Sequence, residues 1–281
     1  MDSPNIDRRD WSALTYAQQV QQIETEGYLV LPNLLTADEI ALLKTETASL
    51  ETTAVDYSEH QRTTGNVQFS GPALTALVGH PPTIRFLEAL LGDQLVMMTY
   101  AYARSDPGHP GISLHTDGQP YGSAIFGYEG SCPVLIRVLY YLDDLTPDVS
   151  PFRVVPRSHL CLHADANPYL RYESHPDEVM VTVAAGSAVL IHHGVFHGNF
   201  PNIGTRSREM LAIAYRPAWA GPIHDVDEWE TTDLASLSPE IRALLGSRNQ
   251  RHATLDGKNK PANMRREAPG MDPNRWSSRH S

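Results

Sequence analysis

Cysteine, basic residues and long apolar runs are all scarce in this sequence, and each shortage argues against a class of protein. Only two of the 281 residues are cysteines, Cys132 and Cys161, and they form no CxxC pair. A disulfide framework or structural zinc ribbon is therefore not expected, and a reducing compartment fits. Lysine and arginine number 22 against 33 aspartates and glutamates, which argues against nucleic-acid or anionic-membrane partners. No window approaches the roughly 20 apolar residues of a membrane-spanning helix, so we expect a cytoplasmic protein.

Apolar residues are present in the proportion that a folded core needs. Hydrophobic residues make up 41% of the chain, which is normal for a globular protein. We interpret residues 1–281 as a single domain. Within it we expect a helical front over residues 13–92, a β core over 94–220 and an irregular C-terminal extension over 226–281.

Three short patterns organise the front. Residues 13–26 are helix-like, and the apolar β-formers of residues 28–31 predict a short strand. Thr36 and Glu39 have the spacing of a capping box, which predicts a helix beginning there. A further helix is expected over residues 81–91, where proline opens the run and glycine follows it.

The chain then turns to short apolar strands separated by glycine, proline and aspartate. Residues 51–72 are polar and predict irregular structure, and the strands begin at about residue 94. Many short strands at such spacing favour an all-β sandwich or barrel over alternating βαβ units. The stretches in question are "QLVMMTYAYAR", "GISLHTD", "PVLIRVLYYLDD", "FRVVPRSH", "VMVTVAAGSAVLIHHGVFHG" and "EMLAIAYRPAW".

His115 and Asp117 form an HxD unit at the end of one such strand. Residues i and i+2 of a strand point to the same side, so an imidazole and a carboxylate would enter one cavity. They would supply two arms of the 2-His-1-carboxylate triad of non-haem Fe(II) oxygenases. By itself the pattern is weak, because most HxD pairs are surface residues or local hydrogen-bond partners.

A third ligand must come from a distant strand, and the candidates are His192, His193 and His197. His197 ends an apolar strand 82 residues after His115 and is the best of the three. The adjacent pair His192 and His193 face opposite ways on a strand and are interpreted as histidines bonded to backbone.

Arg208 follows His197 by eleven residues and enters the apolar strand "MLAIAY". A buried guanidinium needs a partner, and a co-substrate carboxylate would match its planar fork. Arg206, two residues earlier, is the alternative. A structural ion pair with one of the many acidic residues is the other interpretation of either arginine.

Together these stretches make the chain resemble the phytanoyl-CoA dioxygenase-like family of Fe(II)- and 2-oxoglutarate-dependent oxygenases, along most of its length. "EGYLVLPNLLTADEIALLK" is similar to the family's front end, and "ISLHTDG" to its first metal motif. "LYYLDDLTPDVSPFRVVPRSH" and "FHGNFPNIGTRSRE" resemble its later segments. The resemblance implies a mainly β fold, a double-stranded β-helix (cupin-like jelly roll) with flanking N-terminal helices.

The resemblance also implies roles for individual residues. His115, Asp117 and His197 would bind Fe(II), and Arg208 would pair with the distal carboxylate of 2-oxoglutarate. Asn199 falls where members often have a serine that touches the same co-substrate. Related halogenases lack the carboxylate ligand, so the presence of Asp117 argues against halogenation.

The chain departs from the family pattern at three places. Asn66 falls where some members have a lysine that reaches the co-substrate, so that charge is missing. Ser150 and Arg157 replace glycines that members usually carry. These departures leave the iron ligands unchanged and bear on the details of co-substrate binding.

Substrate contacts are the hardest to infer. Arg137, Leu139 and Tyr141 share one side of their strand, and Arg137 either binds an anionic substrate group or forms a structural ion pair. Gln119, just beyond the metal motif, is a substrate candidate or part of an ordinary turn. Tyr100 and Tyr102 are core aromatics or pocket walls, with at least one expected in the core.

The resulting prediction is an Fe(II)/2-oxoglutarate-dependent dioxygenase that uses O2 as second co-substrate and hydroxylates a small molecule, with specialised metabolism as one setting. Desaturation, cyclisation and epimerisation use the same kind of site and stay open, as does the oligomeric state. The rival hypotheses are a metal-dependent cupin enzyme that does not use 2-oxoglutarate and a non-catalytic binding protein of the same fold.

Overall fold

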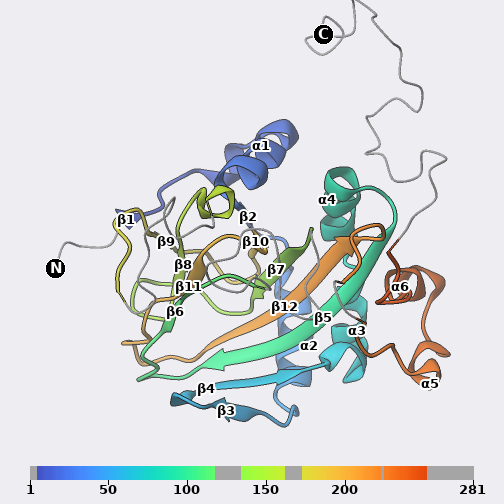
Figure 1. The fold of residues 1–281 in the computed structure, drawn as a ribbon. Coiled ribbons are helices and arrows are strands. Elements are labelled where there is room, and N and C mark those ends of the chain that lie inside the picture. Colours follow the sequence, from blue (N-terminus) through green and yellow to red (C-terminus); the bar gives the residue numbers. More distant parts are fainter. Residues whose placement is uncertain (1–4, 118–133, 162–172, 223–224, 252–281) are drawn as a thin grey trace, which may run out of the picture.

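Two β-sheets facing each other form the body of the protein in the computed structural model, which describes residues 5–117, 134–161, 173–222 and 225–251 (Figure 1). Every strand pair is antiparallel except β1 with β9. This is the mainly β jelly roll that the sequence predicts. The larger sheet has the order β2 (Tyr28–Leu31), β10 (Ala188–His192), β7 (Ile136–Tyr141), β12 (Arg208–Pro217), β5 (Leu95–Ser105), β4 (Ser58–Gly65), β3 (Thr53–Val55). The smaller sheet has the order β1 (Asn5–Ile6), β9 (Val179–Val181), β8 (Phe152–Val154), β11 (His197–Asn199), β6 (Ile112–His115).

Helices from the N-terminal third pack on the outer side of the larger sheet (Figure 1). Two buried tyrosines attach the two helices nearest β5 in sequence: the Tyr215 hydroxyl donates to the Val78 carbonyl at 2.7 Å, and the Tyr140 hydroxyl donates to Thr83 Oγ1 at 2.7 Å. The helices are α1 (Tyr16–Glu26), α2 (Ala37–Thr47), α3 (Pro72–Val78) and α4 (Pro81–Leu91), and α5 (Thr231–Leu234) and α6 (Pro239–Leu244) follow the last strand. Short 3₁₀ turns lie at η1 (Trp11–Ala13), η2 (Val67–Phe69) and η3 (Ser158–Leu160).

Local signals set the helix boundaries where the sequence predicts them. Thr36 accepts a hydrogen bond from the Glu39 amide while the Glu39 side chain bonds back to Thr36, which completes a capping box at the start of α2. At the end of α1, Gly27 has a φ of 80°, a left-handed conformation that glycine adopts without steric cost.

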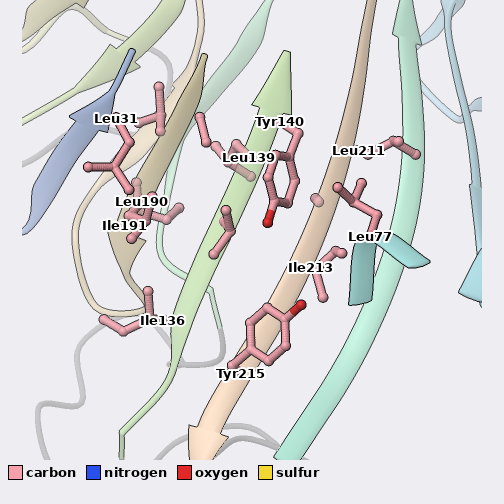
Figure 2. Close-up of a cluster of buried hydrophobic side chains, with 14 of the residues drawn as sticks. Leu31, Leu77, Ile136, Leu139, Tyr140, Leu190, Ile191, Leu211, Ile213 and Tyr215 are labelled. Atoms are coloured by element: carbon pink, nitrogen blue, oxygen red, sulfur yellow. The ribbon is translucent and has the colours of Figure 1, made fainter. Parts of the chain in front are cut away.

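Alternation along β7 and β12 separates the core from the space between the sheets. Figure 2 shows Leu77 of α3 beside Leu211 and Ile213 of β12, with Tyr140 and Tyr215 projecting from β7 and β12. The residues in between point the other way, toward the smaller sheet. That face carries Arg208 and Met210 on β12 and Arg137, Leu139 and Tyr141 on β7.

The expectation that at least one tyrosine of β5 belongs to the core is confirmed for both. Tyr100 pairs in register with Ile213 and Tyr102 with Leu211, so both side chains lie on the helix side of the sheet. Both are buried, and the Tyr102 hydroxyl donates to Glu209 Oε2 at 2.7 Å.

Two segments expected to be irregular have regular structure. Within residues 51–72, the polar strands β3 and β4 form a hairpin that pairs with the edge of β5. Their sequence lacks an apolar alternation because the hairpin lies at the sheet edge. Backbone hydrogen bonds within the hairpin and to β5, and not burial of side chains, therefore determine that these residues form strands. In the C-terminal extension, Ser238 caps α6, which buries Ile241 and Leu244.

No helix in the described part of the chain is long and apolar enough to span a membrane.

Candidate metal centre

Two histidines from neighbouring strands of the smaller sheet lie side by side. His115 ends β6 and His197 begins β11, and the two residues are partners in the antiparallel register. Their ring centroids are 4.4 Å apart. Each Nδ1 bonds a backbone carbonyl, Ser113 O at 2.9 Å for His115 and Val195 O at 3.0 Å for His197. Because a carbonyl only accepts, Nδ1 carries a proton in both rings, which leaves Nε2 as the atom that can bind a metal.

Asp117 completes a group of three that could hold a metal ion. Its Oδ1 lies 3.9 Å from His115 Nε2, and its Oδ2 lies 3.6 Å from His197 Nε2. One potential ligand atom from each residue lies within 4.8 Å of the other two. The sequence predicts that Asp117 lies on the same extended strand as His115, but β6 ends at His115. Asp117 is instead held by its backbone amide, which donates a hydrogen bond to the His193 carbonyl at 2.9 Å.

The charges at this group suit a divalent cation. Burial alone would raise the pKa of the Asp117 carboxyl, but Arg137 and the neighbouring imidazoles lower it below its usual value. Burial lowers the pKa of His197 to about 4, so this imidazole is neutral at physiological pH. Two imidazoles and one carboxylate are the donor set of the non-haem Fe(II) triad, so these residues fit that metal.

Arg208 is a fully buried guanidinium without a carboxylate partner among the described residues. Its Nη2 donates to Ser105 Oγ at 2.9 Å and to Ser150 Oγ at 3.3 Å. Its Nε and Nη1 are buried, and neither has a hydrogen-bond partner among the residues that the structure describes. Unpaired buried donors are expensive, so the geometry fits an incoming carboxylate, as 2-oxoglutarate would supply. The alternative arginine, Arg206, is exposed, and its guanidinium donates to Thr146 Oγ1 at 3.4 Å.

Asn199 links this guanidinium to the histidines. It lies two residues beyond His197 on β11, and its Nδ2 donates to the Ser150 carbonyl at 3.3 Å. Its side chain also contacts the Tyr141 hydroxyl, and the Arg208 guanidinium carbon lies 5.7 Å from the centre of the Tyr141 ring. Asn199 is 7% exposed, so its side chain is largely shielded from solvent.

Arg137 lies at the metal group itself. Its Nε is 2.9 Å from Asp117 Oδ2, although the N–H does not point along the line that a hydrogen bond requires. Of the two interpretations of Arg137, the structure therefore shows the ion pair, and its partner is the candidate metal ligand Asp117. Gln119, the other substrate candidate, lies outside the described residues.

His192 and His193 do not belong to the group of three, although His193 contacts Asp117 through its backbone carbonyl. The two rings are stacked with centroids 4.5 Å apart, and His192 Nδ1 accepts from the Gly194 amide at 3.0 Å. In the part of the chain that the structure describes, His115, Asp117 and His197 are the one group of three that could hold a metal.

The structure shows polar neighbours of Arg208 that sequence reasoning missed. Gln61 on β4 is buried and accepts from the Ser105 hydroxyl, which in turn accepts from Arg208. Only the β4–β5 register, which pairs Gln61 with Ser105, reveals this contact. Asn66 is exposed beyond the far end of β4, about 16 Å along the strand from Gln61 at the usual rise per residue, so it does not take the lysine's place.

The comparison with protein families gives a match that spans the candidate site. The model of the phytanoyl-CoA dioxygenase family matches residues 23–210, a span that includes all three candidate ligands and Arg208. Among curated proteins, the dioxygenase trt7 of Aspergillus terreus is 22% identical over 256 residues, covering 86% of this chain and 87% of its own.

Solved structures share the fold. The carbocyclase SnoK from nogalamycin biosynthesis superposes with a TM-score of 0.63 at 19% identity, covering 85% of this chain and 95% of its own. HygX from Streptomyces hygroscopicus, solved with nickel and 2-oxoglutarate, gives 0.62 at 19% identity over 80% and 95%. The epimerase SnoN gives 0.62 at 18% identity over 74% and 85%.

Proposed function

Because the chain belongs to the phytanoyl-CoA dioxygenase family, and is thus an Fe(II)- and 2-oxoglutarate-dependent oxygenase, we propose that it hydroxylates a small organic molecule at iron held by His115, Asp117 and His197. The observation that carries the proposal is the convergence of these three side chains from two strands and a bend, with ligand atoms within 4.8 Å of one another.

Each residue of the triad has a defined part. The two imidazoles offer Nε2 lone pairs, because their Nδ1 protons bond backbone carbonyls. Asp117 supplies the one anionic ligand and is anchored through its amide. Three protein ligands on one side of a metal leave the opposite positions for the co-substrates.

Arg208 would bind the distal carboxylate of 2-oxoglutarate, and Asn199 would contact the same group. Arg208 is buried and lacks an acidic partner among the described residues, so its charge is available to a ligand. Burial between the sheets keeps water from competing for those N–H groups. Once bound, iron and 2-oxoglutarate supply O2-dependent oxidation of a C–H bond, with succinate and CO2 as by-products.

The substrate enters the proposal by its chemical class. HygX has been solved with hygromycin B and SnoN with nogalamycin RO, both small molecules. We extend that class to this chain, with specialised metabolism as the setting. Gln119 and Arg137 would contact the substrate, since the Arg137 side chain is 29% exposed besides pairing with Asp117. Hydroxylation is the simplest outcome of the triad; SnoN is an epimerase and SnoK a carbocyclase, so product analysis must distinguish these reactions.

The first test is an anaerobic titration of the apoprotein with Fe(II) and then 2-oxoglutarate, followed by visible absorption. We expect a charge-transfer band in the wild type. Asp117→Ala should lose Fe(II) binding because it removes the anionic ligand. Arg208→Ala should keep Fe(II) and need about 10- to 100-fold more 2-oxoglutarate, the usual effect of losing a hydrogen bond to a charged group.

Arg206→Ala is the matched control, because Arg206 is an exposed arginine two residues from Arg208 and should titrate like the wild type. Iron binding without a band would favour a cupin enzyme that does not use 2-oxoglutarate. Absence of iron binding would show that the ligand assignment is wrong. With a substrate found by succinate release, gain of one oxygen atom supports hydroxylation, and loss of two hydrogens supports desaturation or cyclisation.

A further inference from the structure

Ser150 adopts a backbone conformation that favours glycine, next to the buried guanidinium of Arg208. Its φ is 48°, in the left-handed region that most side chains avoid. Of the four non-glycine residues with positive φ in the described ranges, Ser150 alone is buried; Asn33, Asn66 and Arg157 are exposed. Non-glycine residues held in such conformations cluster at functional sites, so the contacts of the Ser150 side chain require an explanation.

The Ser150 hydroxyl acts toward Arg208 as an acceptor only. Its single proton goes to the Phe200 carbonyl at 3.1 Å, so its lone pair receives the Nη2 hydrogen of Arg208. Ser105 is arranged in the same way: its proton goes to Gln61 Oε1, and its oxygen accepts from Nη2. The two serine oxygens thus both accept hydrogen bonds from Nη2.

The rest of the guanidinium is free to bind a ligand. Of its five N–H bonds, those on Nε and Nη1 remain, and both atoms are buried without a hydrogen-bond partner in the described part of the chain. Hydroxyl partners hold the group in place without neutralising its charge, whereas a carboxylate partner would compete with an incoming anion. The main chain of Ser150 also accepts a hydrogen bond from Asn199 at 3.3 Å, so both proposed co-substrate contacts meet at this residue.

We propose that Ser150 is a positioning residue that, together with Ser105, orients Arg208 so that Nε and Nη1 face the distal carboxylate of 2-oxoglutarate. The inference rests on the proposed function, since it assigns the ligand of Arg208. It explains why a serine occupies a glycine-favouring position: the hydroxyl is needed there, although the backbone conformation disfavours it.

The test uses Ser150→Ala and Ser150→Gly in the full-length protein loaded with Mn(II). Calorimetric titrations would measure the dissociation constants of 2-oxoglutarate and of oxalate, which chelates a metal and has no distal carboxylate. Both variants should bind 2-oxoglutarate about 3- to 10-fold more weakly, the usual effect of losing one hydrogen bond. Oxalate affinity should stay within error of the wild type.

Thermal unfolding separates the hydroxyl from the backbone. Ser150→Gly should melt higher than Ser150→Ala, because glycine tolerates positive φ and alanine does not. Asn33 has a φ of 51° and an exposed side chain, which makes Asn33→Ala and Asn33→Gly the matched controls. They should show the same order of melting temperatures and unchanged affinity for 2-oxoglutarate.

Three results would overturn the proposal: unchanged 2-oxoglutarate affinity in both variants, equal loss of oxalate affinity, or a loss in Ser150→Ala that Ser150→Gly restores. The last would assign the effect to backbone strain. A wild-type protein that binds Mn(II) but not 2-oxoglutarate would instead contradict the proposed function, and the two failures are therefore distinguishable.

Discussion

Individual side chains between the sheets are held in defined protonation states by burial. His109, in the loop before β6, is 1% exposed, and its Nδ1 lies 3.3 Å from Ser58 Oγ. Burial, followed by the charges of Arg208 and His60, lowers the pKa of His109 from 6.5 to about 4. The folded protein thus excludes a proton that the unfolded chain takes up below pH 6.5.

This gives a pH-dependent prediction for stability. The folded pKa is lower than the unfolded one, so the folded state loses stability as the pH falls from 6.5 to about 4. The contribution of His109 over that window is about 3 kcal/mol. Urea unfolding of apoprotein at several pH values should show a shallower acid-side decline in His109→Gln than in the wild type. The two curves should run parallel above pH 7; parallel curves at pH 5 as well would contradict the assignment.

At the scale of elements, neighbouring helices satisfy each other's backbone groups. α3 begins at a proline without a capping side chain of its own. Glu46 of α2 supplies the cap instead: Oε1 accepts from the Ala73 amide at 2.9 Å and Oε2 from the Leu74 amide at 2.8 Å. A carboxylate at a helix N-terminus also interacts favourably with the helix dipole. The contact fixes α3, whose Leu77 packs on the larger sheet.

Glu46→Ala should therefore lower the free energy of unfolding by about 1–2 kcal/mol, the usual effect of losing a charged cap. Glu46→Gln keeps one acceptor oxygen and should lose less. Urea denaturation measures both, with Glu51→Ala at an exposed position as control. An Ala variant as stable as the control would mean that solvent caps α3 equally well.

At the scale of the whole molecule, one buried arginine joins the last strand to the C-terminal extension. Arg216 of β12 is fully buried. Its Nη1 donates to the Ala218 carbonyl at 2.9 Å, and its Nη2 donates to the Arg248 carbonyl at 2.8 Å. The extension thereby closes against β5, where α6 packs (Figure 1).

Arg216→Met should cost about 2–4 kcal/mol of unfolding free energy, because buried carbonyls lose their donor. Amide hydrogen exchange should rise in residues 238–251 more than in the sheets. The exposed arginine variant Arg206→Met serves as control and should stay within about 0.5 kcal/mol of the wild type. Uniformly faster exchange across both sheets would show that Arg216 supports the core and not the extension.

Sequence alone determined the features that depend on local order. Helix starts at Thr36 and Pro81, the strand over residues 28–31 and the mainly β core follow from capping, alternation and turn residues, which act over a few positions. His115, Asp117, His197 and Arg208 are predicted from their residue types and spacing together with the family resemblance, and the structure brings the two histidines and the aspartate together.

Tertiary structure alone decided what depends on register and burial. Gln61 and Ser105 are 44 positions apart, and only the β4–β5 pairing places both beside Arg208. The polar hairpin of β3 and β4 has no apolar pattern to announce it, because the neighbouring strand β5 supplies the hydrogen bonds. Hydrogen bonds between strands connect residues irrespective of their separation in the chain, so the surroundings of Arg208 could be recognised only after the sheets had formed.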